Sequence, residues 1–273
     1  MSAFPIGVML ESFRLPMPQS LRIARELGAQ GIQAHAKDIT DQNKKELADR
    51  LRDNGLVLSA LCGDLGKGFG NPEWNPELIE ASKRFLYLAK ELGTDVVTTH
   101  IGVVPSDKNH PRYHIMQDAC GELARYADQL NAHFAVETGP ETAKTLCGFL
   151  DDLHSTGVSV NLDPANLVMV TGDDPVQGVY TLKNYIVHTH AKDGRKLFDR
   201  DPEIIYRIVA PDEPVTDESF IELPLGEGDV PFPDYLNALR EIGYTGFLTI
   251  EREVGADPVS DIRRAADFLR ALF

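Results

Sequence analysis

Five acid and histidine residues stand at the ends of strand-like runs, at a spacing close to one repeat of a parallel β/α fold. The runs are DVVTTH, HFAVE, VSVNLD, YIVHTH and GFLTIE, which end at His100, Glu137, Asp163, His190 and Glu251. The successive gaps are 37, 26, 27 and 61 residues, and one β-α-β unit takes about 30 residues. A polar residue that recurs at this period after an apolar strand indicates the carboxyl end of a parallel barrel, where catalytic residues gather.

The last four of these residues would close neighbouring strands, so their side chains should face one small volume. They are Glu137, Asp163, His190 and Glu251. Three carboxylates and one imidazole suit a hard or borderline cation such as Mn²⁺, Mg²⁺ or Co²⁺. Zn²⁺ is an alternative, although it usually prefers more nitrogen or sulfur ligands. We therefore expect one divalent metal ion and place Mn²⁺ first, while a helix cap or a hydrogen-bonded core residue is the structural alternative for each residue alone.

Eight strand-like runs alternate with helical patterns along the chain. The strands are predicted at 5–10, 31–36, 56–62, 95–100, 133–137, 158–163, 185–190 and 246–251. Amphipathic helices are predicted at 20–28, 41–55 (with Asp41 as the cap), 77–93, 113–130, 233–243 and 257–273. This alternation favours a parallel sheet, and eight units favour its closure into a (β/α)8 TIM barrel. We expect one domain over residues 1–273, since about 250 residues are typical of such a barrel.

Composition narrows the classes of function. Hydrophobic residues make up 42% and charged residues 25% of the chain, as in soluble globular proteins. The net charge of −15 disfavours binding to nucleic acid, because like charges repel. No apolar run approaches the roughly 20 residues of a membrane span, and no signal peptide is recognised at the start. Three widely spaced cysteines predict neither a disulfide framework nor a zinc finger, so we expect a cytoplasmic protein.

One connection is longer than a β/α unit needs. Sixty residues separate His190 from Glu251, and the helix of that unit is predicted at 233–243. The stretch 192–230 is therefore predicted to be an insertion after strand seven, on the face that carries the site. Long loops in compact domains are usually functional or disordered. We expect a lid or a subunit contact, which would make a homo-oligomer plausible, with a disordered excursion as the alternative.

Several motifs carry a resemblance to a known superfamily. They include His-Ala-Lys-Asp at 190–193, Leu-Gly-Glu-Gly at 225–228, and the run from Gly243 to Glu251. The chain resembles the xylose isomerase-like barrel superfamily, which contains sugar epimerases, sugar isomerases and endonuclease IV. The resemblance implies a single metal held by Glu137, Asp163, His190 and Glu251, with the two glutamates moving protons.

The expected substrate is a small sugar or keto-polyol that chelates the metal through a carbonyl and an adjacent hydroxyl. The metal would act as a Lewis acid and stabilise an enediolate. Glu137 and Glu251 would remove and return the proton, which gives an isomerase or an epimerase. The alternatives are dehydration of an inosose-like substrate on the same site, an endonuclease IV-like phosphodiesterase, and a non-catalytic sugar-binding barrel.

Five further residues are candidates for contact with substrate, each with an ordinary structural alternative. They are His100 and Asn166 beside the predicted metal, Arg195 after the His-Ala-Lys-Asp motif, Glu11 after strand one, and Trp74 after strand three. Asn166 stands where many sugar epimerases have a histidine; it can hydrogen-bond a sugar hydroxyl but cannot accept a proton. This departure leaves the identity of the sugar open.

Overall fold

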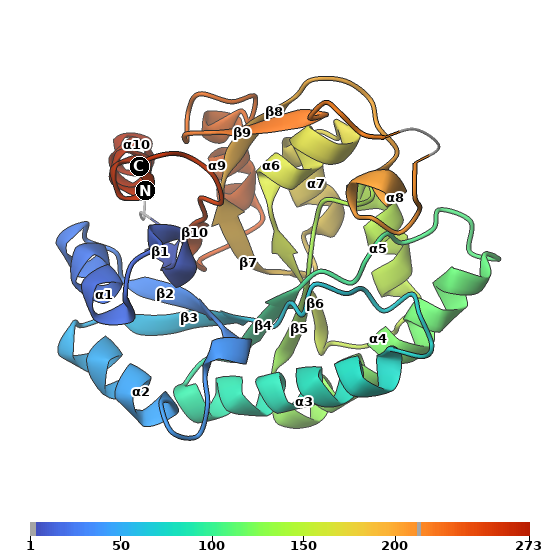
Figure 1. Cartoon of the computed structure of the whole chain (residues 1–273), viewed down its shortest axis with the longest axis horizontal. Coiled ribbons are helices and arrows are strands. Elements are labelled where there is room, and N and C mark those ends of the chain that lie inside the picture. The colour runs from blue at the N-terminus through green and yellow to red at the C-terminus, as the bar shows by residue number, and fades with distance from the viewer. Residues whose placement is uncertain (1–3, 212–213) are drawn as a thin grey trace.

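A computed structural model describes residues 4–211 and 214–273, and within them eight parallel strands close into a barrel (Figure 1). The strands are β1 (Ile6–Met9), β2 (Gly31–His35), β3 (Val57–Cys62), β4 (Val96–Thr99), β5 (His133–Glu137), β6 (Val158–Leu162), β7 (Ile186–Ala191) and β10 (Leu248–Ile250). Their order around the barrel is β1-β10-β7-β6-β5-β4-β3-β2. The predicted (β/α)8 barrel is confirmed, and each of the eight predicted strands is present.

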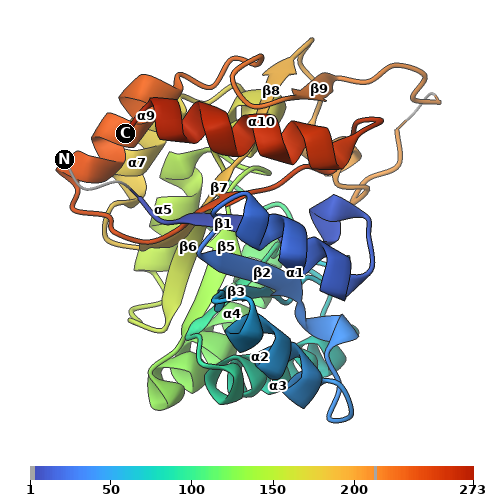
Figure 2. The ribbon, with the colours of Figure 1, turned by 90° about the vertical axis from the view of Figure 1, so that its left-hand side faces the viewer.

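Helices surround the strands, with apolar faces packed inward (Figures 1 and 2). They are α1 (Met17–Glu26), α2 (Lys44–Asp53), α3 (Asn75–Leu92), α4 (Pro111–Leu130), α5 (Ala143–Asp151), α6 (Pro164–Asn166), α7 (Pro175–Leu182), α9 (Phe232–Glu241) and α10 (Pro258–Ala271). Short turns η1 (Leu10–Phe13), η2 (Ala36–Asp38) and η3 (Leu167–Thr171) follow β1, β2 and α6. Among the described residues, no helix has both the length and the apolar character needed to cross a membrane.

The start of α2 differs from the prediction. Asn43 precedes the first helical residue, Lys44, and the side chain of neither Asn43 nor Asp41 caps the helix. Asp41 lies further out and forms an ion pair with the Lys44 ammonium at 3.0 Å. The predicted Asp41 cap is therefore wrong, because a turn over residues 41–43 delays the helix.

The interior of the barrel is polar near its carboxyl end. Gln33, Thr98, Asn161, His188 and Thr249 are each at most 1% exposed, and they hydrogen-bond across strands. We call these five residues the floor network. The usual interior of such a barrel is a set of layers of branched apolar side chains. A polar layer at this depth satisfies its own hydrogen bonds and supports whatever lies above it.

Between β7 and α9, the described residues 192–211 and 214–230 form two short strands and a short helix outside the eight-stranded barrel sheet (Figure 1). Strands β8 (Asp193–Lys196) and β9 (Phe220–Leu223) pair in antiparallel fashion, and the short helix α8 (Pro202–Ile205) lies between them in sequence. The buried carboxylate of Asp193 accepts hydrogen bonds from the backbone N–H groups of Gly226, Gly228 and Val230 at 2.9, 3.0 and 3.2 Å. This segment is therefore fastened at its base; its function as a lid or a subunit contact stays a prediction.

Candidate metal centre and substrate cavity

Four side chains from neighbouring strands meet at the carboxyl end of the barrel. Glu137 ends β5, Asp163 follows β6, His190 lies in β7 and Glu251 follows β10. One potential ligand atom from each lies within 4.8 Å of the others. The His190 Nδ1 atom is 3.4 Å from Asp163 Oδ2, 3.4 Å from Glu251 Oε2 and 3.6 Å from Glu137 Oε1. The structure thus brings together all four residues that the sequence predicted as ligands.

His190 is oriented from behind by the floor network. Its Nε2 lies 3.0 Å from Gln33 Oε1, and the Gln33 amide donates to Thr98 Oγ1 at 2.9 Å. Since Gln33 presents its oxygen, Nε2 carries a proton, and Nδ1 is the ring atom that faces the three carboxylates. Burial opposes protonation of this ring, but Glu251 and Glu137 raise the pKa of His190 well above its usual value. The negative charge that holds this proton would also attract a metal cation.

Glu137 is held by amide donors. Asn161 Nδ2 donates to Glu137 Oε2 at 3.0 Å, and Asn166 Nδ2 donates to Glu137 Oε1 at 3.2 Å. His188 Nδ1 in turn contacts Asn161 Oδ1 at 2.9 Å, which fixes the direction of that amide. Burial, helped by the charge of His190, lowers the pKa of His188 well below its usual range, so His188 is a neutral core residue. These contacts hold the Glu137 carboxylate in one orientation.

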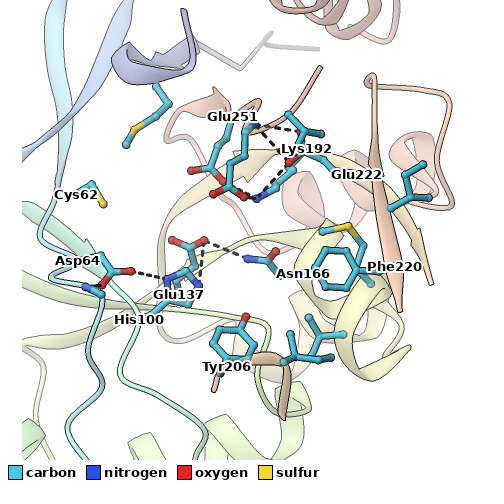
Figure 3. A pocket seen from close by; sticks show the side chains of 18 of the residues that line it. Cys62, Asp64, His100, Glu137, Asn166, Lys192, Tyr206, Phe220, Glu222 and Glu251 are labelled. Atoms are coloured by element: carbon cyan, nitrogen blue, oxygen red, sulfur yellow. Dashed lines mark hydrogen bonds and ion pairs between the residues drawn. The ribbon is translucent and has the colours of Figure 1, made fainter. Parts of the chain in front are cut away.

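Glu251 is paired with a buried cation. Lys192 is 3% exposed, and its Nζ lies 3.0 Å from Glu251 Oε2, while it also pairs with Glu253 (Figure 3). Burial would raise the pKa of Glu251, but the positive charges of His190 and Lys192 hold it well below its usual range. Glu251 is therefore ionised. A divalent ion fits this donor set, because three oriented carboxylates converge there with the His190 Nδ1 atom, whose proton a bound cation would replace.

His100 faces the same space from β4. Its Nδ1 lies 3.1 Å from Asp64 Oδ2, and its Nε2 lies 3.6 Å from Glu137 Oε1 (Figure 3). Burial would lower the pKa of His100, but Glu137 and Asp64 outweigh it and raise the pKa to about 9. Near neutral pH this ring is a cation that can donate a hydrogen bond into the cavity.

These groups lie at the base of a cavity of about 790 Å³. His100, Glu137, Asn166, Lys192 and Glu251 line it, together with Tyr206, which follows α8 in the segment 192–230. Figure 3 shows the Tyr206 hydroxyl on the same side as Asn166 and Glu137. The space accommodates a molecule the size of a small sugar.

Three other predicted contacts do not line this cavity. The Glu11 carboxylate accepts a hydrogen bond from the backbone of His35 at 3.0 Å and lines a smaller pocket of about 230 Å³. Arg195 is half exposed, and its Nε donates to Asp229 at 2.8 Å. Trp74 is 45% exposed and lines an adjoining cavity. The structure therefore places Glu11 and Arg195 outside this cavity, and their contact with substrate stays a prediction.

Sequence reasoning missed several residues of the site. Gln33 and Asn161 orient the predicted ligands, Tyr206 closes one wall, and Asp64 anchors His100. Two of these residues could have been found from the sequence. Gln33 and Asn161 are amides inside otherwise apolar strands, and a buried amide needs hydrogen-bond partners. The position of Tyr206 could not have been found in this way, since nothing in the sequence says which part of the segment 192–230 contacts the site.

Comparison with known proteins agrees with this architecture. A solved xylose isomerase domain protein from Planctomyces limnophilus superposes with a TM-score of 0.80 at 24% identity, covering 100% of this chain and 98% of that one. A xylose isomerase-like TIM barrel protein from Mycobacterium smegmatis, solved in complex with magnesium, gives 0.75 at 19% identity over 100% and 98% of the two chains. The 3-keto-D-glucoside 4-epimerase of E. coli gives 0.76 at 16% identity over 98% and 99%.

At these identities the solved structures establish the fold. The sequence itself matches the family model described as xylose isomerase-like TIM barrel over residues 21–272. Since that match spans nearly the whole sequence, the chain belongs to the xylose isomerase-like TIM barrel family.

Proposed function

We propose that this protein is a metal-dependent isomerase or epimerase that acts on a small sugar or keto-polyol. The observation that carries the proposal is the meeting of the buried Glu137 and the partly buried Glu251 with Asp163 and His190 at the carboxyl end of the barrel. A protein that only binds a sugar has no need of two carboxylates at one cation site. The fold shared with an epimerase of 3-keto-D-glucosides is consistent with this chemistry.

Glu137, Asp163, His190 and Glu251 would hold one divalent ion, which supplies Lewis acidity toward a substrate carbonyl. The protein itself contributes proton transfer by its carboxylates. One of the two glutamates removes the proton next to the carbonyl, and the other returns a proton. Lys192 holds Glu251 in place at 3.0 Å, and Asn166 holds Glu137 at 3.2 Å, so both groups are oriented before substrate arrives.

A dehydratase on the same site is the second candidate. His100 Nε2 lies 3.6 Å from Glu137 and faces the cavity, so a third proton-carrying group borders the reacting volume. Loss of a β-hydroxyl needs a group that protonates the departing oxygen, whereas isomerisation does not. The two candidates differ in their product: a dehydratase releases water and forms an unsaturated ketone.

The test is proton exchange in D₂O. The metal-loaded protein is incubated with ketoses, inososes and hydroxypyruvate, and the recovered compounds are analysed by NMR after chelation of the metal. We expect deuterium at a carbon next to the carbonyl of one compound. Glu251→Gln should abolish this exchange, because an amide cannot accept the proton. Glu46→Gln, on the outer helix α2, is the matched control and should exchange at the normal rate.

Metal content is measured on the same samples. One ion per chain agrees with the proposal, whereas two or three would point to a hydrolase of the endonuclease IV type. Exchange that persists at a normal rate in Glu251→Gln would contradict the assigned role of Glu251. The absence of exchange with every compound, in protein that holds one ion, would contradict isomerase chemistry.

A further inference from the structure

A second cavity, of about 600 Å³, opens beside the metal cavity. The two share Asp64, Gly66, His100 and Tyr206 in their walls, so they are neighbouring chambers of one cleft. The glycine-rich loop at 63–70 and the first residues of α4 form much of the second chamber. The function proposed above uses only the first chamber, which leaves this space without a role.

The two chambers differ in charge. The metal chamber has an excess of acids: Asp64, Glu137, Glu218, Glu222, Glu251 and Glu253 line it, with Lys37 and Lys192 as its lysines. The second chamber is lined by three cations, Lys67, Arg112 and Arg207, and by one carboxylate, Asp64, which the two chambers share. In a chain of net charge −15 with 27 lysines and arginines against 42 acids, three cations around one cavity form a local reversal of charge. Such a cavity attracts a negatively charged group.

Arg112 is the most buried of the three cations. Its side chain is 16% exposed, and one arm of its guanidinium pairs with Glu203. Its Nε atom is buried and donates to no atom of the described residues. A buried donor without an acceptor is costly, and it shows that this guanidinium is only partly paired within the described residues. Gly70 permits the arrangement, because a Cβ at residue 70 would lie 2.8 Å from Arg112 Cδ.

The other two cations border the same space. The Lys67 ammonium lies 4.9 Å from the centre of the Trp74 ring, which places its charge over the aromatic face. Arg207 directly follows the turn of α8 in a left-handed conformation, with φ of 58°. Within the described residues, its side chain makes no hydrogen bond or ion pair that would neutralise it. Trp74 thus lines the cationic chamber.

We propose that the second chamber binds an acidic group, a phosphate or a carboxylate, carried by the substrate at the end remote from the reacting carbons. The substrate class would then be a keto sugar or keto-polyol with a terminal acid. This inference rests on the proposed function for the placement of the ketone end at Glu137 and Glu251. An anion would accept hydrogen bonds from Lys67 and Arg207 beside the charge of Arg112, and charge-assisted bonds of this kind are the strong ones.

The test compares matched ketoses by titration calorimetry on the magnesium-loaded protein. The probes are D-fructose, D-fructose 6-phosphate and D-fructuronate. We expect one of the acid-bearing ketoses to bind at least about tenfold more tightly than D-fructose, the gain typical of one charge-assisted hydrogen bond. Whichever acid gives the larger gain identifies the natural group as phosphate or carboxylate. Equal affinity for all three compounds would overturn the proposal.

Substitutions locate the binding. Lys67→Gln and Arg207→Gln should each reduce the advantage of the acid-bearing ketose by about tenfold and leave D-fructose unaffected. Lys45→Gln on α2 and Arg263→Gln on α10 remove the same charges from exposed positions outside both chambers and should change nothing. A preference that survives both chamber substitutions would place the anion elsewhere and refute the assignment.

Binding of inorganic phosphate tests the anion site without a ketone substrate. It should bind to the same protein and lose about tenfold in affinity in Lys67→Gln and Arg207→Gln. If deuterium exchange fails but this loss is observed, the proposed reaction is wrong and the anion site stands. If exchange succeeds with uncharged ketoses and neither phosphate nor the acid-bearing ketoses respond to the substitutions, the reaction stands and the anion site is refuted.

Discussion

Glu141 is a buried carboxyl group outside the metal centre. It is 7% exposed, its Oε2 accepts a hydrogen bond from the Val104 backbone at 3.1 Å, and its Oε1 has no partner within the described residues. Burial raises the pKa of Glu141 from its ordinary 4.5 to about 8. Near neutral pH the folded protein therefore keeps this group mainly as the uncharged acid.

This shift predicts a pH dependence of stability. Because the folded state binds the proton more tightly than the unfolded state, the stability present below pH 4.5 is lost as the pH rises toward 8. Glu141→Gln removes the titrating group while keeping its shape. The free energy of unfolding of wild type relative to the variant should fall with pH, by up to about 1.4 kcal/mol per pH unit. Urea titrations at pH 5, 6, 7 and 8 would check it; a constant difference would contradict the prediction.

Gln33 orients His190 in the candidate metal centre. Its oxygen accepts the Nε2 proton of His190 at 3.0 Å and so presents Nδ1 to the three carboxylates. Gln33→Leu keeps the approximate volume but removes the acceptor. We expect metal affinity to fall by about 10- to 100-fold, as for other outer partners of ligating histidines. Competition with a chelator would measure it, with Gln19→Leu on the surface of α1 as the control. Unchanged affinity would show that the tautomer is fixed by other contacts.

At the scale of elements, Asp193 joins the two ends of the segment between β7 and α9. Its carboxylate accepts four backbone N–H groups, from Gly194, Gly226, Gly228 and Val230. Asp193→Ala would leave these donors without an acceptor, at about 1–3 kcal/mol for each that stays buried. We expect faster amide hydrogen exchange at 226–230 and unchanged exchange in β4 and β5. Asp229→Ala, whose partner Arg195 is exposed, is the control. Equal protection in the two variants would mean that the segment is held by other contacts.

The eight strands could be predicted because each is an apolar run bounded by turn residues. Their spacing of about 30 residues is that of a β-α-β unit, in which successive strands run parallel. The meeting of Glu137 with Glu251 was predictable for the same reason, since parallel strands end at one face. The Asp41 cap was wrong because helix starts depend on local turns that compete closely in energy. Tyr206 was beyond prediction, because its place at the cavity depends on how β8 and β9 pair.

At the scale of the whole molecule, a cation at the centre should stabilise the fold. Folding brings together three carboxylates from strands that are distant in sequence, and a bound ion offsets their repulsion. A ligand that binds only the folded state adds about 2.7 kcal/mol at a concentration 100 times its dissociation constant. Thermal unfolding with Mn²⁺ and with a chelator would measure the difference. Asp163→Asn, which removes one buried charge of the centre, should reduce the gain; an equal gain in that variant would place the stabilising ion elsewhere.

The floor network has a consequence for how such a protein can change over evolutionary time. Its hydrogen bonds tie β2, β4, β6, β7 and β10 together, so a change at Asn161 or His188 leaves a buried partner unmatched. A substitution in the floor network would be tolerated mainly when a second substitution removes or restores the partner of the lost hydrogen bond. The described residues of 63–70 and 192–230, which line the two chambers, are not joined to one another by buried hydrogen bonds of this kind. New substrate preferences should therefore arise by drift in residues 63–70 and 192–230, above a base that stays the same.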